Sequence, residues 1–109
     1  MDYLINSAVI AAPGLYRYEL LTEAQAGRWL EERIRDGHLD LESRIGYDAT
    51  AAEVERLCGV RPALSREQSR LEPGDEALVV RLPYRVADPA TKGTHVPAGW
   101  EYGLLRREG

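Results

Sequence analysis

Arginine residues are concentrated in the middle of the chain, at Arg61, Arg66, Arg70, Arg81 and Arg85. A guanidinium group binds phosphate through paired, charge-assisted hydrogen bonds, and two of them side by side are typical of a phosphate site. A single arginine is most often a solvated surface residue without a special role. The function therefore depends on which of these arginines the fold brings together.

A predicted β-hairpin indicates one such pair. Residues 65–71 and 76–82 have the composition of strands, and the Glu-Pro-Gly-Asp sequence between them favours a tight turn. Antiparallel strands run in opposite directions, so Arg66, at the start of one strand, is expected near Arg85, just beyond the end of the other. The pair predicts a phosphate-binding site, and Ala-Leu-Val-Val at residues 77–80 is expected to be the best core strand.

A second anion-binding feature is the predicted start of a helix within the segment RIGYDATAAEVERLCG, residues 44–59. We expect Asp48 or Thr50 to cap this helix and Gly59 to end it, with Tyr47 at or just before its first turn. The free N–H groups and the positive dipole end of a helix start attract anions. Helix starts are common, so this feature alone is unspecific.

The remaining elements complete an α/β pattern. Residues 2–10, 15–21 and 100–106 are predicted strands, and residues 83–99, rich in proline and glycine, are predicted to form a long loop or lid. Thr22 and Gln25 form a capping box before a helix expected to stop at Gly37. Five strands and two helices indicate an α/β layer structure in one domain, residues 1–109.

The amino-acid composition and the net charge disfavour several classes of function. Of 109 residues, 44% are hydrophobic and 29% charged, as in ordinary globular proteins, and the formal net charge of −4 disfavours duplex nucleic acid. Without a spanning segment or a basic leader, we expect a cytoplasmic protein that does not bind membranes. One cysteine, Cys58, and two histidines, His38 and His95, provide no plausible zinc ligand set. We expect Cys58 to pack as a small apolar residue, and we expect no metal or other cofactor.

Five segments, taken in order, resemble a known family. They are LINSAV, RIGYDATAAEVERLCG, SREQSRLEPGDEALVVRL, YRVAD and WEYGLL, and they extend over nearly the whole chain. Their order and spacing resemble the viral ring nucleases that act as anti-CRISPR proteins by degrading cyclic tetra-adenylate, together with their bacterial relatives. The resemblance implies a small mixed β-sheet with flanking helices, assembled as a twofold homodimer. It also implies a pocket on the dimer axis, which suits a ring of four nucleotides.

The resemblance also implies roles for particular residues. The phosphate-handling arginines of the family correspond to Arg66 and Arg85, and its loop carboxylate to Asp88, where the family usually has glutamate. Its N-terminal ligand-contacting turn corresponds to Asn6 and Ser7. We also expect Arg81 and His95 among the ligand-binding residues.

The chain departs from the family pattern at Tyr47. The family motif is Ile-Gly-His followed by an acidic residue, with the histidine as catalytic acid, whereas this chain has Ile-Gly-Tyr-Asp at residues 45–48. The implied reaction is a metal-independent attack of a ribose 2′-OH on the adjacent phosphodiester, assisted by a proton donor. Imidazole, with a pKa of about 6.5, suits that task better than phenol, with a pKa of about 10.

Three interpretations of Tyr47 therefore stay open: a slower general acid, a residue that only stacks on adenine or bonds a phosphate, or a structural ring beside the helix start. His95, in the predicted lid beside Lys92, is a further candidate acid, although a loop histidine is more often simply solvated. His38 is expected to be a cap or surface residue.

Two functions compete. The first is a ring nuclease that cleaves cyclic oligoadenylate and so dampens type III CRISPR signalling. The second is a non-catalytic protein that sequesters or senses the same ligand, and the residue at position 47 separates the two. A scaffold that has lost ligand binding is a third interpretation, but the presence of Arg66, Arg85 and an acid at residue 88 argues against it.

Overall fold

The computed structural model describes residues 2–6, 13–67, 70–82 and 99–109. The elements, in chain order, are β1 (Asp2–Ile5), β2 (Tyr16–Leu21), α1 (Glu23–Glu31), β3 (Ile34–Arg35), β4 (His38–Leu39), β5 (Glu42–Arg44), α2 (Asp48–Cys58), β6 (Glu76–Arg81) and β7 (Glu101–Arg107). This α/β composition confirms the predicted fold class.

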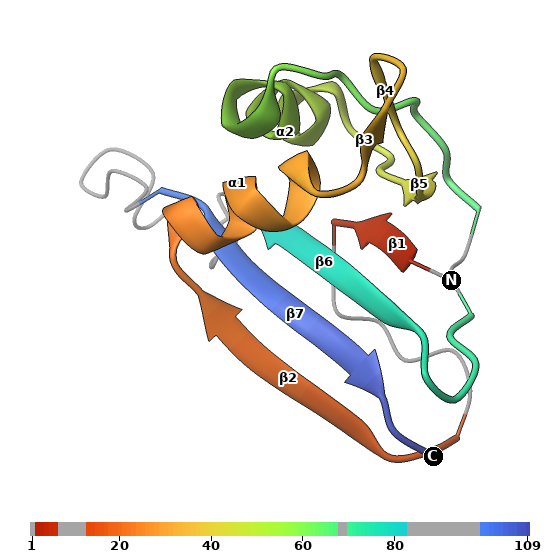
Figure 1. Cartoon of the computed structure of the whole chain (residues 1–109). Helices are drawn as coiled ribbons and strands as arrows, with labels where there is room; N and C mark the ends of the chain where they lie inside the picture. The colour runs from red at the N-terminus through yellow and green to blue at the C-terminus, as the bar shows by residue number, and fades with distance from the viewer. Residues whose placement is uncertain (1, 7–12, 68–69, 83–98) are drawn as a thin grey trace, which may run out of the picture.

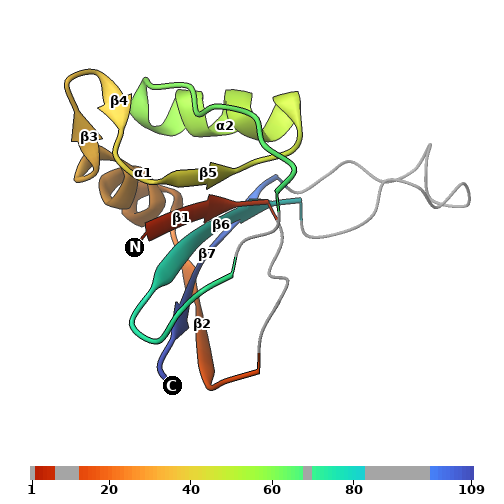
Figure 2. The ribbon, with the colours of Figure 1, turned by 90° about the vertical axis from the view of Figure 1, so that its right-hand side faces the viewer.

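The main sheet has five strands in the order β2-β7-β6-β1-β5 (Figures 1 and 2). Strand β1 pairs in parallel with both β5 and β6, whereas β7 pairs antiparallel with β6 and β2. The sheet is therefore mixed, as expected. The carboxyl ends of β1, β5 and β6 consequently meet at one edge of the sheet.

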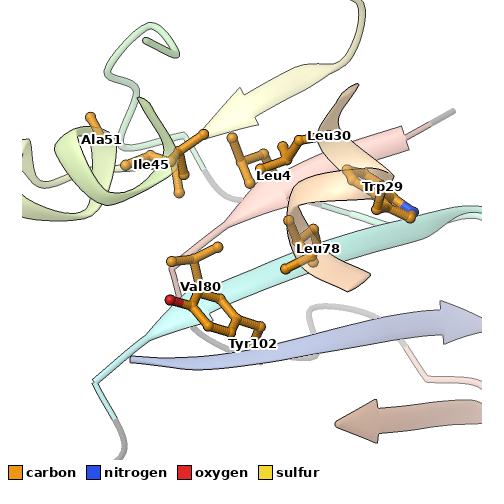
Figure 3. Close-up of a cluster of buried hydrophobic side chains, with 10 residues drawn as sticks. Leu4, Trp29, Leu30, Ile45, Ala51, Leu78, Val80 and Tyr102 are labelled. Atoms are coloured by element: carbon orange, nitrogen blue, oxygen red, sulfur yellow. The ribbon is translucent and has the colours of Figure 1, made fainter. Parts of the chain in front are cut away.

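Both helices pack on the same face of the sheet, and the core lies beneath them (Figure 3). Leu4, Leu78 and Val80 of the sheet are fully buried with Leu30 of α1 and Val54 of α2. Each such side chain contributes roughly 1.5–3 kcal/mol by leaving water. All of residues 77–80 are buried, which confirms the predicted core strand.

The first helix starts as predicted but ends earlier. Thr22 Oγ1 accepts a hydrogen bond from the Gln25 N–H, and Gln25 Oε1 accepts one from the Thr22 N–H, which completes the capping box. The helix ends at Glu31, so the prediction that it stops at Gly37 was wrong. Asp36 and Gly37 have φ values of 53° and 77° and form the two-residue turn between β3 and β4. Asp-Gly suits this turn because both positions need positive φ.

The second helix begins directly after Tyr47, which occupies the N-cap position without a capping side-chain hydrogen bond. The prediction that Asp48 or Thr50 would cap the helix was therefore wrong. Gly59, with φ of 83°, ends the helix, and its N–H donates to the Glu55 carbonyl at 2.7 Å, as predicted. Glycine suits this position because left-handed backbone strains other residues.

The described residues do not form the predicted hairpin before β6. Residues 72–75 do form a turn, in which the Asp75 N–H donates to the Glu72 carbonyl at 2.9 Å. However, none of the described residues between 65 and 75 belongs to a strand, and the neighbours of β6 are β1 and β7. Because β1 occupies the edge of β6 that a hairpin partner would need, the hairpin predicted to bring Arg66 near Arg85 does not form.

The other strand predictions hold in part. Residues 15–21 and 100–106 correspond to β2 and β7, whereas only residues 2–5 of the predicted strand 2–10 are described as strand. Most of that strand's second half and nearly all of the predicted lid, residues 83–98, lie outside the described residues. Within the described ranges, no helix is long and apolar enough to span a bilayer.

Candidate functional site

The candidate site lies at the edge of the sheet where the parallel strands end. Strand β5 continues through Ile45, Gly46 and Tyr47 into α2, and β1 continues into Asn6. The Asn6 side-chain oxygen accepts a hydrogen bond from the Gly46 N–H at 3.3 Å, so the ends of the two strands are tied together. In open α/β sheets, ligands bind outside the carboxyl ends of the strands.

The segment after α2 brings a cation to this edge. It runs beside β5: Leu64 forms a parallel bridge with Ile45, and the Ser65 N–H donates to the Ile45 carbonyl at 2.8 Å. The Ser43 hydroxyl donates to the Ala63 carbonyl at 2.7 Å and holds the segment further along. The next residue in the segment is Arg66, which therefore lies next to Tyr47.

Arg66 and Tyr47 form the centre of the site. The guanidinium carbon of Arg66 lies 5.5 Å from the centroid of the Tyr47 ring, within the range of a cation–π contact. Gly46 makes this arrangement possible, since a Cβ atom there would come within 3.2 Å of the Arg66 Cγ. Neither this role of Gly46 nor the extended segment was predicted from the sequence. Pro62, which favours extended backbone before it, was the available signal for the segment.

These groups border an open hollow of about 390 Å³. Its lining residues are Gly46, Tyr47, Asp48, Leu64, Ser65 and Arg66. Tyr47 is 58% exposed, and no carboxylate of the described residues pairs with Arg66. The hollow thus presents an aromatic face for stacking and a cation for an anion, beside the N-terminus of α2.

Asp48 places one carboxylate in the same hollow. Its Oδ1 atom lies 3.2 Å from Nη2 of Arg61, whose Nη1 also lies 3.4 Å from the Glu55 carboxylate. These groups are largely exposed, so the pairs contribute little stability. Arg61 nevertheless offsets part of the repulsion that Asp48 would exert on an anion in the hollow.

Arg81 is engaged elsewhere. Its Nε lies 2.7 Å from the Glu101 carboxylate on β7, and the same oxygen accepts a hydrogen bond from the Tyr18 hydroxyl at 3.1 Å. The hydrogen bond to Glu101 raises the pKa of Arg81, and burial, together with Glu101, raises the pKa of Tyr18. Arg81 is thus paired with an acid of its own sheet and does not line the hollow of Tyr47 and Arg66, so its predicted role in ligand binding stays a prediction.

The structure brings three of the predicted site residues together, namely Asn6, Tyr47 and Arg66. Four others lie outside the described residues: Ser7, Arg85, Asp88 and His95. Within the described parts of the chain, no group of three or more histidine, cysteine or acidic side chains could hold a metal ion.

A larger hollow, of about 630 Å³, lies beside the first and shares Ser65 with it. Two arginines line it, and both are already paired. Nη1 of Arg44 lies 3.2 Å from Glu42 and its Nη2 lies 3.6 Å from Glu67, and Arg61 contacts Asp48 and Glu55 as described above. The acids beside these two guanidinium groups therefore disfavour an anion in this hollow. We regard the smaller hollow as the better candidate because its cation is unpaired among the described residues.

Comparisons with known proteins agree with this fold. B116 of Sulfolobus turreted icosahedral virus superposes with a TM-score of 0.72 over 97% of this chain and 98% of its own, at 22% sequence identity. The uncharacterized protein YddF of Bacillus subtilis strain 168 is 33% identical over 66 residues. That match covers 61% of this chain and 57% of YddF, which is less than two thirds of the relative's length.

A family comparison covers most of the chain. The family described as STIV B116-like matches residues 2–95, which include the whole of the Tyr47–Arg66 hollow. The chain therefore belongs to the STIV B116-like family.

Proposed function

We propose that the protein binds cyclic tetra-adenylate in a pocket shared by two copies of the chain. We further propose that it opens the ring to linear products without a metal, and so dampens type III CRISPR signalling. The observation that supports this proposal most directly is the exposed Tyr47 ring beside the Arg66 guanidinium at the start of α2.

The hollow matches the chemistry of one nucleotide unit. A nucleotide offers an aromatic base and a phosphate, and the hollow offers an aromatic ring, a cation and the N–H groups of a helix start. Its volume of about 390 Å³ is near the lower limit for small-molecule pockets. A four-nucleotide ring therefore needs more than one such hollow, which two copies of the chain would supply.

In the proposed reaction, a ribose 2′-oxygen attacks the adjacent phosphorus and releases its proton to water. The bond from phosphorus to the 5′-oxygen breaks, leaving a 2′,3′-cyclic phosphate on one end, and the departing 5′-oxygen takes up a proton. Arg66 stabilises charge on the phosphorane, and the Tyr47 hydroxyl donates the proton to the 5′-oxygen and regains one from water. The family resemblance adds Arg85 and Asp88 to this machinery.

The second candidate function is binding without cleavage. It is favoured by the identity of residue 47, because phenol is a poorer acid near neutral pH than the imidazole of the family motif. The position of the Arg66 guanidinium near the Tyr47 ring equally suits a ring that only stacks on a base. In that case the protein would sequester or sense the cyclic nucleotide.

Single-turnover incubation with cyclic tetra-adenylate, followed by separation of the products, tests the first proposal. We expect linear products from the wild type, slower cleavage with little change in affinity for Tyr47→Phe, and a stoichiometry of one ring to two chains by calorimetry. His95→Ala serves as the comparison for the other candidate acid. If Tyr47→Phe cleaves at the wild-type rate while His95→Ala is inactive, His95 is the proton donor.

Tight binding without cleavage by any variant would establish the sequestering function instead. If the ligand neither binds nor is cleaved at micromolar protein, both proposals fail.

A further inference from the structure

Asp48 is the acidic residue of the candidate site, and no step of the proposed reaction uses it. It is the first residue of α2, directly after Tyr47, and it lines the same hollow as Tyr47 and Arg66. Its side chain is 81% exposed, so its carboxylate is open to a ligand. An acid in the first turn of a helix also interacts favourably with the helix dipole. A role in the site therefore has to be separated from this effect by experiment.

Arg61 holds one oxygen of the Asp48 carboxylate and leaves the other available. Nη2 of Arg61 lies 3.2 Å from Oδ1, whereas Oδ2 has no hydrogen bond to any of the described residues. Nη1 of Arg61 lies 3.4 Å from the Glu55 carboxylate, so the guanidinium group spans two acids of α2. An ionised carboxylate only accepts hydrogen bonds. Oδ2 is therefore an acceptor that a hydroxyl or amino group of a ligand can fill.

The charges of the hollow favour a hydrogen-bond donor that stands beside a phosphate. Asp48 is the one carboxylate among the described lining residues, and on its own it would repel the phosphate proposed to bind Arg66. Arg61 offsets part of that repulsion. In a ribonucleotide, the 2′-hydroxyl is a donor next to a backbone phosphate, whereas an amino group of the base lies further from it. The 2′-hydroxyl therefore suits Oδ2 best.

We infer that Asp48 binds the ribose 2′-hydroxyl beside the phosphate held by Arg66, and that it takes the hydroxyl proton when the 2′-oxygen attacks. This inference rests on the proposed function and deepens it, because it makes the site selective for ribose over deoxyribose. The 2′-hydroxyl is the group by which a protein distinguishes RNA from DNA.

The proton passes through Asp48 on its way to water. The 2′-oxygen forms its bond to phosphorus as its proton moves to the Asp48 carboxylate, and the bond from phosphorus to the 5′-oxygen breaks as Tyr47 supplies a proton there. Asp48 then releases its proton to water, and Tyr47 regains one. Because the two residues are adjacent, the start of α2 provides both the proton donor and the proton acceptor.

Binding of two rings tests the sugar selection. Cyclic tetra-adenylate is compared with its all-2′-deoxy form, which has the same bases and phosphates and no nucleophile, by stopped-flow measurements read before cleavage. We expect the wild type to bind the ribose ring about 10- to 150-fold more tightly for each hydroxyl bound, as for one charge-assisted hydrogen bond. For Asp48→Ala, this ratio should fall to about 1. The ribose ring should bind more weakly, whereas the deoxy ring should bind equally well or better, because a repelling charge is gone.

The ratio separates this role from an effect on the helix. Loss of a favourable charge at the start of α2 would weaken both rings equally and leave their ratio unchanged. Glu55→Ala is the matched control, since Glu55 also pairs with Arg61 but does not line the hollow, and it should keep the wild-type ratio. Asp48→Asn retains an oxygen acceptor but cannot take up the proton. It should keep part of the ratio, while single-turnover cleavage of the ribose ring slows roughly 100-fold or more.

The outcomes distinguish this inference from the proposed function. A wild-type ratio near 1, or the same ratio for the wild type and Asp48→Ala, would overturn the sugar selection while the proposed function stands. Cleavage by Asp48→Asn at the wild-type rate would overturn the proton transfer to Asp48. Failure of the wild type to bind either ring would refute the proposed function and this inference together.

Discussion

Removal of the Arg66 side chain tests the candidate site with little risk to the fold. Arg66 is exposed, and its charge has no carboxylate partner among the described residues, so we expect Arg66→Ala to change the free energy of unfolding by under about 0.5 kcal/mol. A charge-assisted hydrogen bond to phosphate contributes roughly 1.5–3 kcal/mol. We therefore expect the dissociation constant for cyclic tetra-adenylate to rise by about 10- to 150-fold.

Isothermal titration calorimetry at two salt concentrations measures this loss. The difference between wild type and variant should shrink at high salt, because ions screen an exposed charge. Arg66→Lys should retain part of the affinity, since it keeps the charge but not the planar pair of donors. Arg28→Ala, at an exposed arginine in the last turn of α1, is the control. Equal losses for Arg66→Ala and Arg28→Ala would refute a specific site, as would a large fall in the melting temperature of Arg66→Ala.

Three other predictions concern catalysis and stability. Tyr47→His should accelerate cleavage, most clearly near or below neutral pH where imidazolium forms, and single-turnover rates no faster than wild type would contradict this. Hydrogen bonds from Arg56 hold the pKa of the buried Glu53 below its usual value, although burial opposes them. The resulting stability is present above a pH of about 4.3 and is lost as the pH falls further, so urea unfolding should show the wild type and Glu53→Gln converging in acid. Gly103→Ala should lower the free energy of unfolding by about 1–3 kcal/mol, because a Cβ atom would overlap the ring of Tyr18, and an unchanged melting temperature would exclude this contact.

The local signals in the sequence were sufficient for several elements. The capping box of Thr22 and Gln25 marks the start of α1, Gly59 marks the end of α2, and residues 77–80 form a buried strand. These features depend on contacts within a few residues of the chain, or on an apolar run that has to be buried. Asp36-Gly37 was also a local signal, but it was misinterpreted. Gly37 was predicted to end a helix, whereas Asp36 and Gly37 form a hairpin turn.

The site itself was only partly predictable. The sequence indicated Tyr47 at a helix start and Arg66 as a phosphate ligand, and both residues lie at one hollow. The predicted position of Arg66, on a hairpin strand paired with β6, was wrong. The turn at residues 72–75 forms, but the described residues of the segment 65–71 before it are not a strand.

The tertiary structure decided the partners of β6 and of Arg66. Strand β1 pairs in parallel with β6 across more than seventy residues of sequence, with Tyr3 opposite Ala77. The segment containing Arg66 instead follows β5, through the bridge between Ile45 and Leu64. Parallel pairing joins segments that are distant in the chain and leaves no turn signature between them, so local residue patterns do not encode which strands become neighbours.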